Sequence, residues 1–153
     1  MGRKSGLKVI IAGMASLPET ARRGALYRKA VERAFATSRK DFRGEVNVVF
    51  LGRAEMRRMN RHYLGHDYDT DVITFEHENP PGMDGPDTPI GDIFISSWMT
   101  CRQARELGHP VAVEAATLAA HGALHLLGHD DHRPAAKARM FKVQDRIVAS
   151  LRG

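Results

Sequence analysis

Apolar and polar positions alternate along the chain with two different periods, and these periods predict its elements. Short apolar runs that alternate or are rich in β-branched residues are typical of strands, whereas apolar residues recurring every three or four positions are typical of helices. The strand pattern covers residues 7–13, 45–52, 71–75 and 90–96. The helix pattern covers residues 20–38, 53–64, 98–107, 111–127 and 133–151. This order predicts an α+β fold, with a mixed four-stranded sheet packed with about five helices.

The segment VAVEAATLAAHGALHLL, residues 111–127, is the most apolar part of the chain and predicts a central, buried helix. Gly128 is well placed to end this helix, and Ser96 or Ser97 to begin the helix before it. Residues 78–89, ENPPGMDGPDTP, are dense in Pro, Gly and Asp and therefore predict a surface loop.

The composition is that of a soluble globular domain. Apolar content of 42% and charged content of 27% are ordinary, and 153 residues without an internal repeat or linker predict a single compact domain, 1–153. The apolar run at residues 7–12 is far shorter than the roughly 20 residues that span a bilayer. The only cysteine, Cys101, cannot form an internal disulfide, as is usual in a reducing compartment. We therefore expect a cytoplasmic protein without membrane association.

The net charge of +5 is unevenly distributed. Residues 1–61 carry fifteen Lys or Arg against five Asp or Glu, residues 62–95 carry none against eight, and residues 96–153 carry eight against five. A basic amino-terminal third suits a phosphate backbone, although an ordinary soluble basic surface explains the charge equally well. Charge therefore admits RNA as a partner without demonstrating it.

Four histidines and two aspartates lie within twelve residues at the end of the apolar helix, HGALHLLGHDDH from His121 to His132. His121 and His125 are four residues apart, so their side chains share a helix face and can take two positions of a tetrahedral metal site. Burying these histidines without partners would be costly, which favours a metal over simple packing. Gly122 stands where a zinc protease of the HExxH type has its glutamate base, which argues against that class.

A third ligand is expected just after the helix. A glycine at the end of a helix adopts the left-handed conformation and reverses the chain, so residues three or four beyond Gly128 can return to the histidine face. Asp131 and His132 are at that distance. Three protein ligands plus water are typical of a catalytic Zn²⁺ site, whereas a structural site has four protein ligands. The sequence therefore predicts one Zn²⁺ ion per chain at the end of the central helix.

The segment HGALHLLGHDD resembles the signature of the YbeY family, which are bacterial metal-dependent endoribonucleases. Two further blocks, TDVITF at 70–75 and GDIFIS at 91–96, are similar to blocks of that family, as is MNRHYLGHD at 59–67. Glu114 stands where many members have a glutamate. The resemblance spans residues 45–132 in matching order.

The resemblance has consequences for fold and function. It implies a compact α+β fold with a mixed four-stranded sheet, a bound Zn²⁺ ion and single-stranded RNA as the substrate. It also implies a role in ribosomal RNA maturation at the 16S 3′ end and in ribosome quality control. The partners implied are rRNA precursors and the small ribosomal subunit.

The sequence departs from the family pattern at two positions. Where the family usually has its third histidine this chain has Asp131, and His132 follows one residue later. The resemblance carries the ligand role to Asp131, and His132 remains the alternative. A carboxylate binds Zn²⁺ at about the distance of an imidazole and lowers the net charge of the ligated ion by one, which slightly favours harder metals. Leu64 stands where many members have an arginine, so either Arg61 or His66 supplies that charge or this protein contacts RNA differently.

Other site residues are assigned by position. His129 and Glu114 are the candidates for a catalytic base, with Glu114, seven residues before His121, better placed to orient an imidazole ring. An acid facing the helix dipole is the alternative for Glu114. Thr70 and Asp71 are expected to line the cleft, with capping or closing a turn before the strand as the alternative for Asp71. The candidates for RNA binding, equally well explained as a solvated helix face and loop, are Arg57, Arg58, Arg61 and His66.

Three functions are compatible with these residues. The first is metal-assisted hydrolysis of RNA phosphodiester bonds. The second is a zinc hydrolase acting on a small molecule or peptide, which would lack a salt-dependent affinity for single-stranded RNA. The third is a ribosome-associated factor with a structural metal, which requires a fourth protein ligand from His129 or His132.

Overall fold

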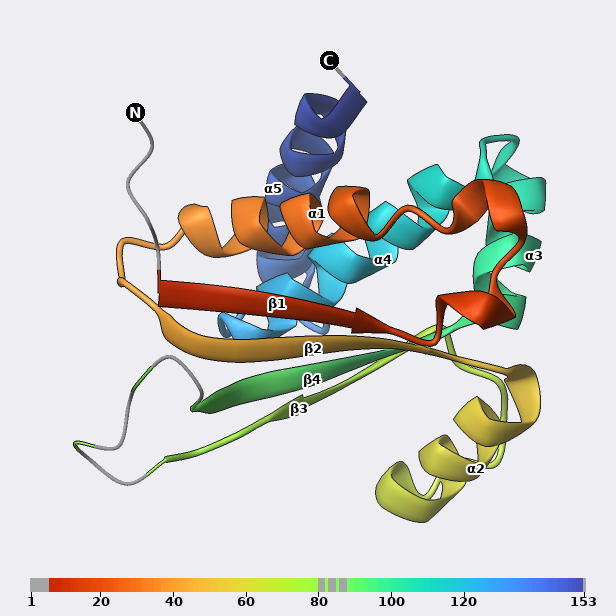
Figure 1. The fold of residues 1–153 in the computed structure, drawn as a ribbon, viewed down its shortest axis with the longest axis horizontal. Coiled ribbons are helices and arrows are strands. Elements are labelled where there is room, and N and C mark those ends of the chain that lie inside the picture. The colour runs from red at the N-terminus through yellow and green to blue at the C-terminus, as the bar shows by residue number, and fades with distance from the viewer. Residues whose placement is uncertain (1–5, 80–81, 83–84, 86–87, 153) are drawn as a thin grey trace.

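A computed structural model describes residues 6–152 except 80–81, 83–84 and 86–87 (Figure 1). Within these residues the chain forms four strands and five α-helices in the predicted order. The strands are β1 (Gly6–Ala12), β2 (Arg43–Leu51), β3 (Val72–Glu76) and β4 (Pro89–Ser96). The helices are α1 (Gly24–Ala36), α2 (Arg53–Leu64), α3 (Ser97–Leu107), α4 (Val111–Leu126) and α5 (Pro134–Arg152). The predicted loop 78–89 falls partly outside the described residues, and its last residue already belongs to β4.

The sheet is mixed, with the strand order β1-β2-β4-β3. β1, β2 and β4 run parallel, and β3 lies at the edge, antiparallel to β4. The predicted α+β fold with a mixed four-stranded sheet is therefore confirmed. No helix in the described ranges combines the length and apolarity needed to cross a membrane.

The start of α1 differs from the prediction. The pattern predicted a helix from residue 20, but Glu19–Ala21 forms a separate 3₁₀ turn and α1 begins at Gly24. The guanidinium group of Arg22 donates to the carbonyl oxygens of Leu17 and Ala15, at 3.1 and 3.2 Å. These bonds tie Arg22 to the segment that precedes the turn.

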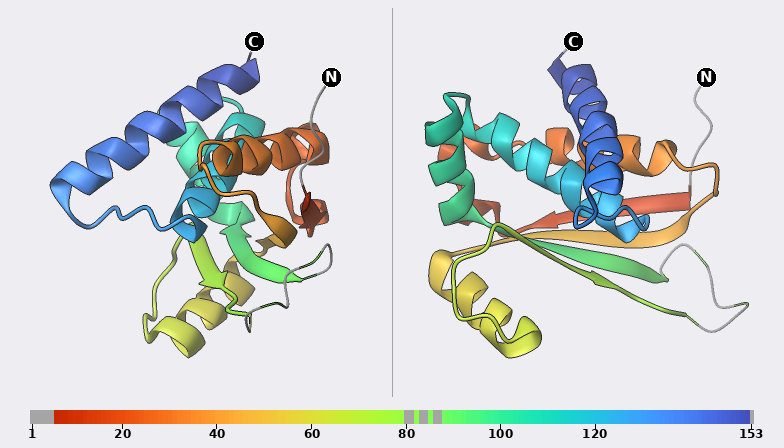
Figure 2. Two further views of the ribbon diagram at one scale, coloured as in Figure 1. Left: turned by 90° about the vertical axis from the view of Figure 1, so that its left-hand side faces the viewer. Right: turned by 180° about the vertical axis from the view of Figure 1, so that it is seen from behind.

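The helices divide between the two faces of the sheet. α1, α4 and α5 lie on one side, α2 lies on the other, and α3 stands at one end (Figures 1 and 2). Successive residues of a strand point to opposite faces, which explains how one sheet packs against both layers. In β2, Val46, Val48 and Phe50 are buried, whereas Asn47 and Val49 between them are partly exposed.

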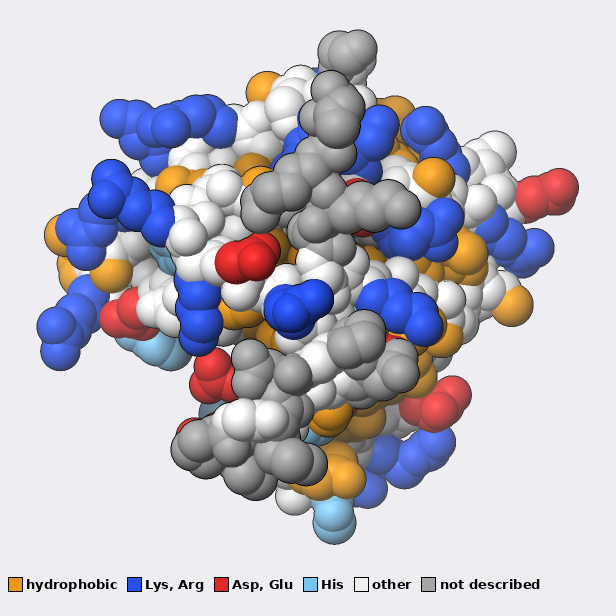
Figure 3. All heavy atoms as spheres, turned by 60° about the vertical axis from the view of Figure 1, so that its left-hand side comes forward, with side chains coloured by type: hydrophobic (Ala, Val, Ile, Leu, Met, Phe, Trp, Pro, Cys, Tyr) orange, Lys and Arg blue, Asp and Glu red, His pale blue; other side chains and the backbone are white. Residues whose placement is uncertain are grey.

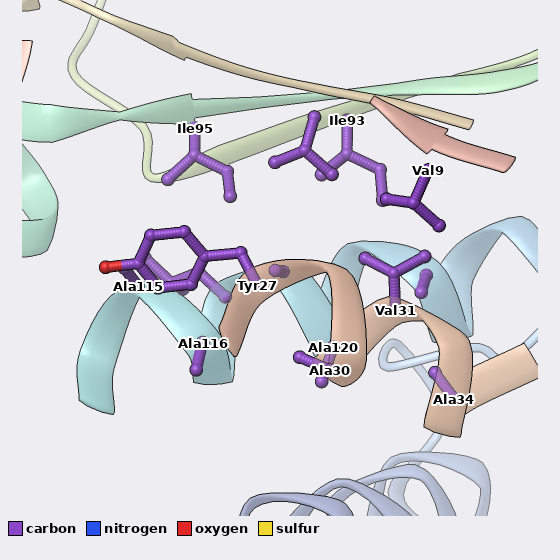
Figure 4. Close-up of a cluster of buried hydrophobic side chains, with 14 of the residues drawn as sticks. Val9, Tyr27, Ala30, Val31, Ala34, Ile93, Ile95, Ala115, Ala116 and Ala120 are labelled. Atoms are coloured by element: carbon purple, nitrogen blue, oxygen red, sulfur yellow. The ribbon is translucent and has the colours of Figure 1, made fainter. Parts of the chain in front are cut away.

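The main core lies between the sheet and the α1–α4 layer. Ile93 and Ile95 of β4 point toward these helices, where Tyr27 and Val31 of α1 meet them (Figure 4). α4 contributes mainly alanines, which allow α1 and α4 to pack closely side by side. Its buried alanines are Ala112, Ala115, Ala116, Ala119, Ala120 and Ala123. The apolar segment 111–127 is thus the central helix that its composition predicted.

Gly122 is required by the contact between α4 and the sheet. A Cβ atom at this position would lie 2.5 Å from Cγ2 of Ile93. We expect Gly122→Ala to lower the free energy of unfolding by about 1–2 kcal/mol, because so close a contact places the cost of overpacking near the upper end of about 1–3 kcal/mol and the gain in helix propensity offsets only about 1 kcal/mol. Urea denaturation would measure this loss.

A double-mutant cycle tests the cause of that loss. Ile93→Ala removes the atoms that the new methyl group would meet, so the double variant should lose less stability than the sum of the single changes. Additive losses would show that Gly122 is needed for another reason.

Candidate metal centre

The predicted metal ligands come from the end of α4 and the loop after it. His121 and His125 lie one turn apart, with ring centroids 4.6 Å from each other. Beyond the helix, Gly128 adopts a φ of 95°. The N–H groups of Gly128 and His129 donate to carbonyl oxygens of the last turn at 2.9 and 3.0 Å, forming a Schellman motif. This turn reverses the chain and carries Asp131 back to the two histidines.

Three side-chain atoms converge on one point. Nε2 of His121 and Nε2 of His125 are 3.1 Å apart, and Oδ2 of Asp131 lies 3.5 Å from the first and 3.4 Å from the second. In a tetrahedral Zn²⁺ site with bonds of about 2.0–2.1 Å, neighbouring ligand atoms are about 3.3–3.4 Å apart. The three atoms therefore have the spacing of a metal site.

Hydrogen bonds fix which nitrogen of each ring faces inward. Nδ1–H of His121 donates to Oε1 of Gln144 at 2.7 Å, and Nδ1–H of His125 donates to the carbonyl oxygen of His129 at 3.1 Å. A neutral imidazole carries one N–H, so both Nε2 atoms present lone pairs. These lone pairs repel each other and the carboxylate oxygen, and a divalent cation between them would satisfy all three. The donor set thus fits a metal ion.

The surroundings of the His125 ring favour its neutral form. Burial lowers the pKa of His125 below its ordinary value, and the neighbouring His121 lowers the pKa further. The carboxylate of Asp131 raises the pKa but does not outweigh burial. Neutral imidazole is the form that binds metal, so this environment favours a ligand role near neutral pH.

Asp131, rather than His132, faces the two histidines. The His132 side chain is 92% exposed, and its Nε2 lies 3.9 Å from Oδ1 of Asp131. In the part of the chain that the structure describes, no fourth His, Cys, Asp or Glu joins the group of His121, His125 and Asp131. Three protein ligands with an open position are typical of a catalytic zinc site rather than a structural one.

Glu114 contacts a different histidine from the ones expected. It is 4% exposed and accepts a hydrogen bond from Nε2–H of His109 at 2.8 Å. The helix explains this placement, because seven residues separate Glu114 from His121 by about 10 Å along the axis. Gln144 of α5 makes the contact that we predicted for Glu114, and His129 contributes its backbone carbonyl group.

The predicted RNA-binding residues lie away from the metal centre. α2 packs on the face of the sheet opposite to α4, so the sheet separates the two helices (Figure 1). Arg57 and Arg61 form ion pairs with Asp67, at 3.2 and 3.8 Å. The ring of His66 is hydrogen-bonded to a neighbouring tyrosine hydroxyl group, and Arg58 is exposed. The structure does not bring these four residues to the metal ligands.

Two hollows flank the metal centre. The first has a volume of about 610 Å³ and is lined by α3, α4 and α5, with His121 and Gln144 among its residues. The second, of about 520 Å³, lies beside the loop after α4 and the start of α5, and its lining includes Arg133 and Arg139. The lining of the first hollow includes Asp71, Glu114 and Asp145, whereas Asp131 itself lines neither hollow.

Sequence reasoning missed several of these residues. Gln144 falls on the apolar face of the pattern over 133–151, and a single polar residue at such a position was a usable signal. Arg133 and Arg139 carry no such signal, because exposed arginines on a helix are common. Of the two residues expected to line a cleft, Asp71 lines the first hollow and Thr70 does not.

Comparison with known proteins identifies the family. The family described as Endoribonuclease YbeY matches residues 16–152. The chain belongs to the YbeY endoribonuclease family. The Endoribonuclease YbeY of Alkalilimnicola ehrlichii is 37% identical over 145 residues, covering 95% of this chain and 85% of the relative. That of Elusimicrobium minutum is 36% identical over 137 residues, covering 88% of this chain and 93% of the relative.

A solved structure supports the fold of this YbeY-family chain. The solution structure of a Thermotoga maritima protein superposes with a TM-score of 0.61 at 24% sequence identity. The match covers 94% of this chain and 89% of that one. The arrangement of the sheet and helices is therefore shared with a protein of known structure.

Gln144 gives a first test of the metal centre in this YbeY-family chain. We expect Gln144→Leu to weaken Zn²⁺ binding by roughly 10- to 100-fold, because the His121 ring loses the acceptor that fixes its orientation. Competition with a chromogenic chelator would measure the affinity. Gln144→Glu keeps an acceptor and should bind Zn²⁺ at least as well as the wild type. Equal affinities for the Leu and Glu variants would contradict the orienting role.

Proposed function

We propose that this chain is a metal-dependent endoribonuclease that cuts single-stranded RNA. The observation that carries the proposal is the convergence of ligand atoms from His121, His125 and Asp131, with no fourth His, Cys, Asp or Glu joining them among the described residues, in a chain of the YbeY endoribonuclease family. We propose Zn²⁺ as the metal, one ion per chain, because two imidazole nitrogens and a carboxylate oxygen are a typical catalytic zinc set.

The chain contributes to the reaction mainly by holding the metal-binding groups in place. A divalent ion held by these residues would lower the pKa of a water molecule and offset charge on the phosphoryl oxygens. Gln144 and the carbonyl group of His129 keep the two imidazole lone pairs directed inward. His129 borders the second hollow and stays our candidate for the catalytic base. Glu114 lies about two helical turns from His121 and is hydrogen-bonded to His109. We therefore assign it to the first hollow instead.

Basic side chains near the metal centre offer a path for the RNA backbone. Lys and Arg side chains are spread widely over the face of the molecule in Figure 3, with fewer Asp and Glu among them. α5 and the loop before it contribute the exposed residues Arg133, Lys137, Arg139, Lys142 and Arg146. We propose that Arg133 and Arg139 bind phosphates beside the metal centre. We assign binding of a more distant part of the RNA strand, beyond the edge of the sheet, to Arg57, Arg58, Arg61 and His66.

The salt dependence of RNA binding tests the phosphate contacts. Each phosphate contact on single-stranded nucleic acid contributes about 0.7 to the slope of log affinity against log salt. We therefore expect Arg139→Ala to reduce the magnitude of that slope by about 0.7, measured by fluorescence anisotropy. Arg105→Ala removes an exposed cation of α3 that lines neither hollow, and should leave the slope unchanged. Equal slopes for all three proteins would remove Arg139 from the RNA path.

A more specific proposal concerns the physiological RNA substrate. We propose that the RNA is a ribosomal precursor cut during maturation of the 16S 3′ end, with the small ribosomal subunit as a partner and a role in ribosome quality control in the cytoplasm. Membership of the YbeY family is what supports this assignment.

Cleavage of defined substrates tests the proposed function. The Zn²⁺-loaded protein is incubated with an end-labelled single-stranded RNA, with the same RNA annealed to its complement, and with the DNA of the same sequence. We expect internal cleavage of the single-stranded RNA alone, loss of cleavage with a chelator, and recovery with added Zn²⁺. Intact RNA together with turnover of a peptide or a small ester would instead support the zinc hydrolase alternative.

A further inference from the structure

The first hollow differs in chemistry from the RNA path. Its walls are partly apolar, with Leu107 of α3, Leu118 of α4 and Val148 of α5. Its polar lining contains three carboxylates, Asp71, Glu114 and Asp145, against one guanidinium group, Arg152. A phosphate group would be repelled by this surplus of negative charge. The hollow therefore suits an uncharged, flat group that carries N–H donors.

Two carboxylate acceptors of this hollow, the partly buried Asp71 and the buried Glu114, are held in place. Oδ1 of Asp71 accepts from the N–H of Val72 at 2.8 Å, and Oδ2 accepts from the side-chain amide of Gln103 at 3.2 Å. Glu114 is fixed by its hydrogen bond from His109. A carboxylate has about four lone-pair positions, so each of these groups can accept a further hydrogen bond from a ligand. Because these acceptors are fixed, they select ligands whose N–H donors lie at matching positions.

An aromatic ring connects the hollow to the metal centre. Phe141 of α5 lines the hollow and is 36% exposed, although it is apolar. Its ring centroid lies 5.7 Å from that of His121. Exposed aromatic rings are the platforms on which unpaired nucleic acid bases stack. The volume of about 610 Å³ is within the range of roughly 300–1,000 Å³ typical of small-ligand pockets.

From Phe141, the fixed carboxylates and the contact with His121, we infer that the first hollow binds the base of the nucleotide next to the scissile phosphate. This inference rests on the proposed function. The base stacks on Phe141, and its N–H groups face Glu114 and Asp71, while the phosphate stays at the metal centre. Bases with an exocyclic amino group are preferred. Uracil is disfavoured because carbonyl groups on both sides of its N–H would face carboxylates.

A double-mutant cycle, with one change in the protein and one in the RNA, tests this inference. The cleaved bond of a short unstructured RNA is mapped first, and an abasic ribose is then placed at each of the two flanking positions. The substrates are compared for the wild type, Phe141→Ala and Phe141→Trp, after their metal content and circular dichroism spectra have been shown to be equal. We expect one abasic position to lower kcat/KM of the wild type by roughly 5- to 150-fold, the range of a lost base-aromatic stack.

The coupling between the two changes decides the outcome. Phe141→Ala should lower kcat/KM on intact RNA by a similar factor and cause little further loss with the abasic RNA, whereas Phe141→Trp should behave as the wild type. An abasic ribose far from the cleaved bond is the matched control. Independent, multiplying losses, or no loss at either flanking position, would overturn the inference.

Binding of the same RNAs, measured by anisotropy, separates this inference from the proposed function. If the wild type shows the coupling in binding but cuts none of these RNAs, the base pocket stands and the endoribonuclease proposal fails. If the wild type cuts RNA without the coupling, the endoribonuclease proposal stands and the base pocket fails.

Discussion

Replacing His121 by alanine is expected to abolish both metal binding and RNA cleavage. His121 supplies one of three converging ligand atoms, and its other nitrogen is bonded to the buried Gln144. Loss of an outer partner of a metal ligand already costs roughly 10- to 100-fold in affinity, so loss of a ligand should exceed 100-fold. Metal content after purification without added metal and cleavage of single-stranded RNA are the two measurements.

A fold control is needed for this variant. His121→Ala leaves the buried amide of Gln144 without its partner, which costs about 1–3 kcal/mol of stability. Circular dichroism and urea denaturation will show whether the variant remains folded at the assay temperature. A double variant, His121→Ala with Gln144→Leu, removes both polar groups and should be more stable than His121→Ala while still binding no metal. A folded variant that keeps both its metal and its activity would contradict the proposed metal centre.

Asp131→Ala is expected to lose the metal, whereas His132→Ala is expected to keep it. The carboxylate of Asp131 lies 3.4–3.5 Å from both histidine nitrogens. The His132 side chain is 92% exposed, and it does not belong to the group of ligand atoms formed by His121, His125 and Asp131. Metal analysis of the two variants beside the wild type measures the difference. If only His132→Ala loses the metal, the ligand set is three histidines and the loop must rearrange on binding.

Asp131→His extends this test to the chemistry of the site. A third imidazole should restore metal binding, because nitrogen and carboxylate oxygen ligands lie at similar distances from Zn²⁺. It also raises the net charge of the ligated ion by one, which should lower the pKa of the activated water. The acidic limb of the pH profile for RNA cleavage is therefore expected to move to lower pH than in the wild type.

Much of the fold follows from local sequence. Two periodicities locate the strands and helices because burial against a flat sheet or a neighbouring helix imposes its own spacing on apolar residues. His121 and His125 share a face because four residues make about one helical turn. Gly128 ends α4 because only glycine adopts the left-handed conformation without strain. These features depend on neighbours along the chain, so the sequence alone was enough to predict them.

The tertiary structure decided which distant groups meet. Gln144 reaches His121 across 23 residues only because α5 returns beside α4. Glu114 meets His109 rather than a metal ligand, and the sheet separates the basic helix α2 from α4. Which of Asp131 and His132 faces the two histidines depends on the path of one loop. Such contacts arise from packing between elements, and the spacing of residues along the chain carries no record of that packing.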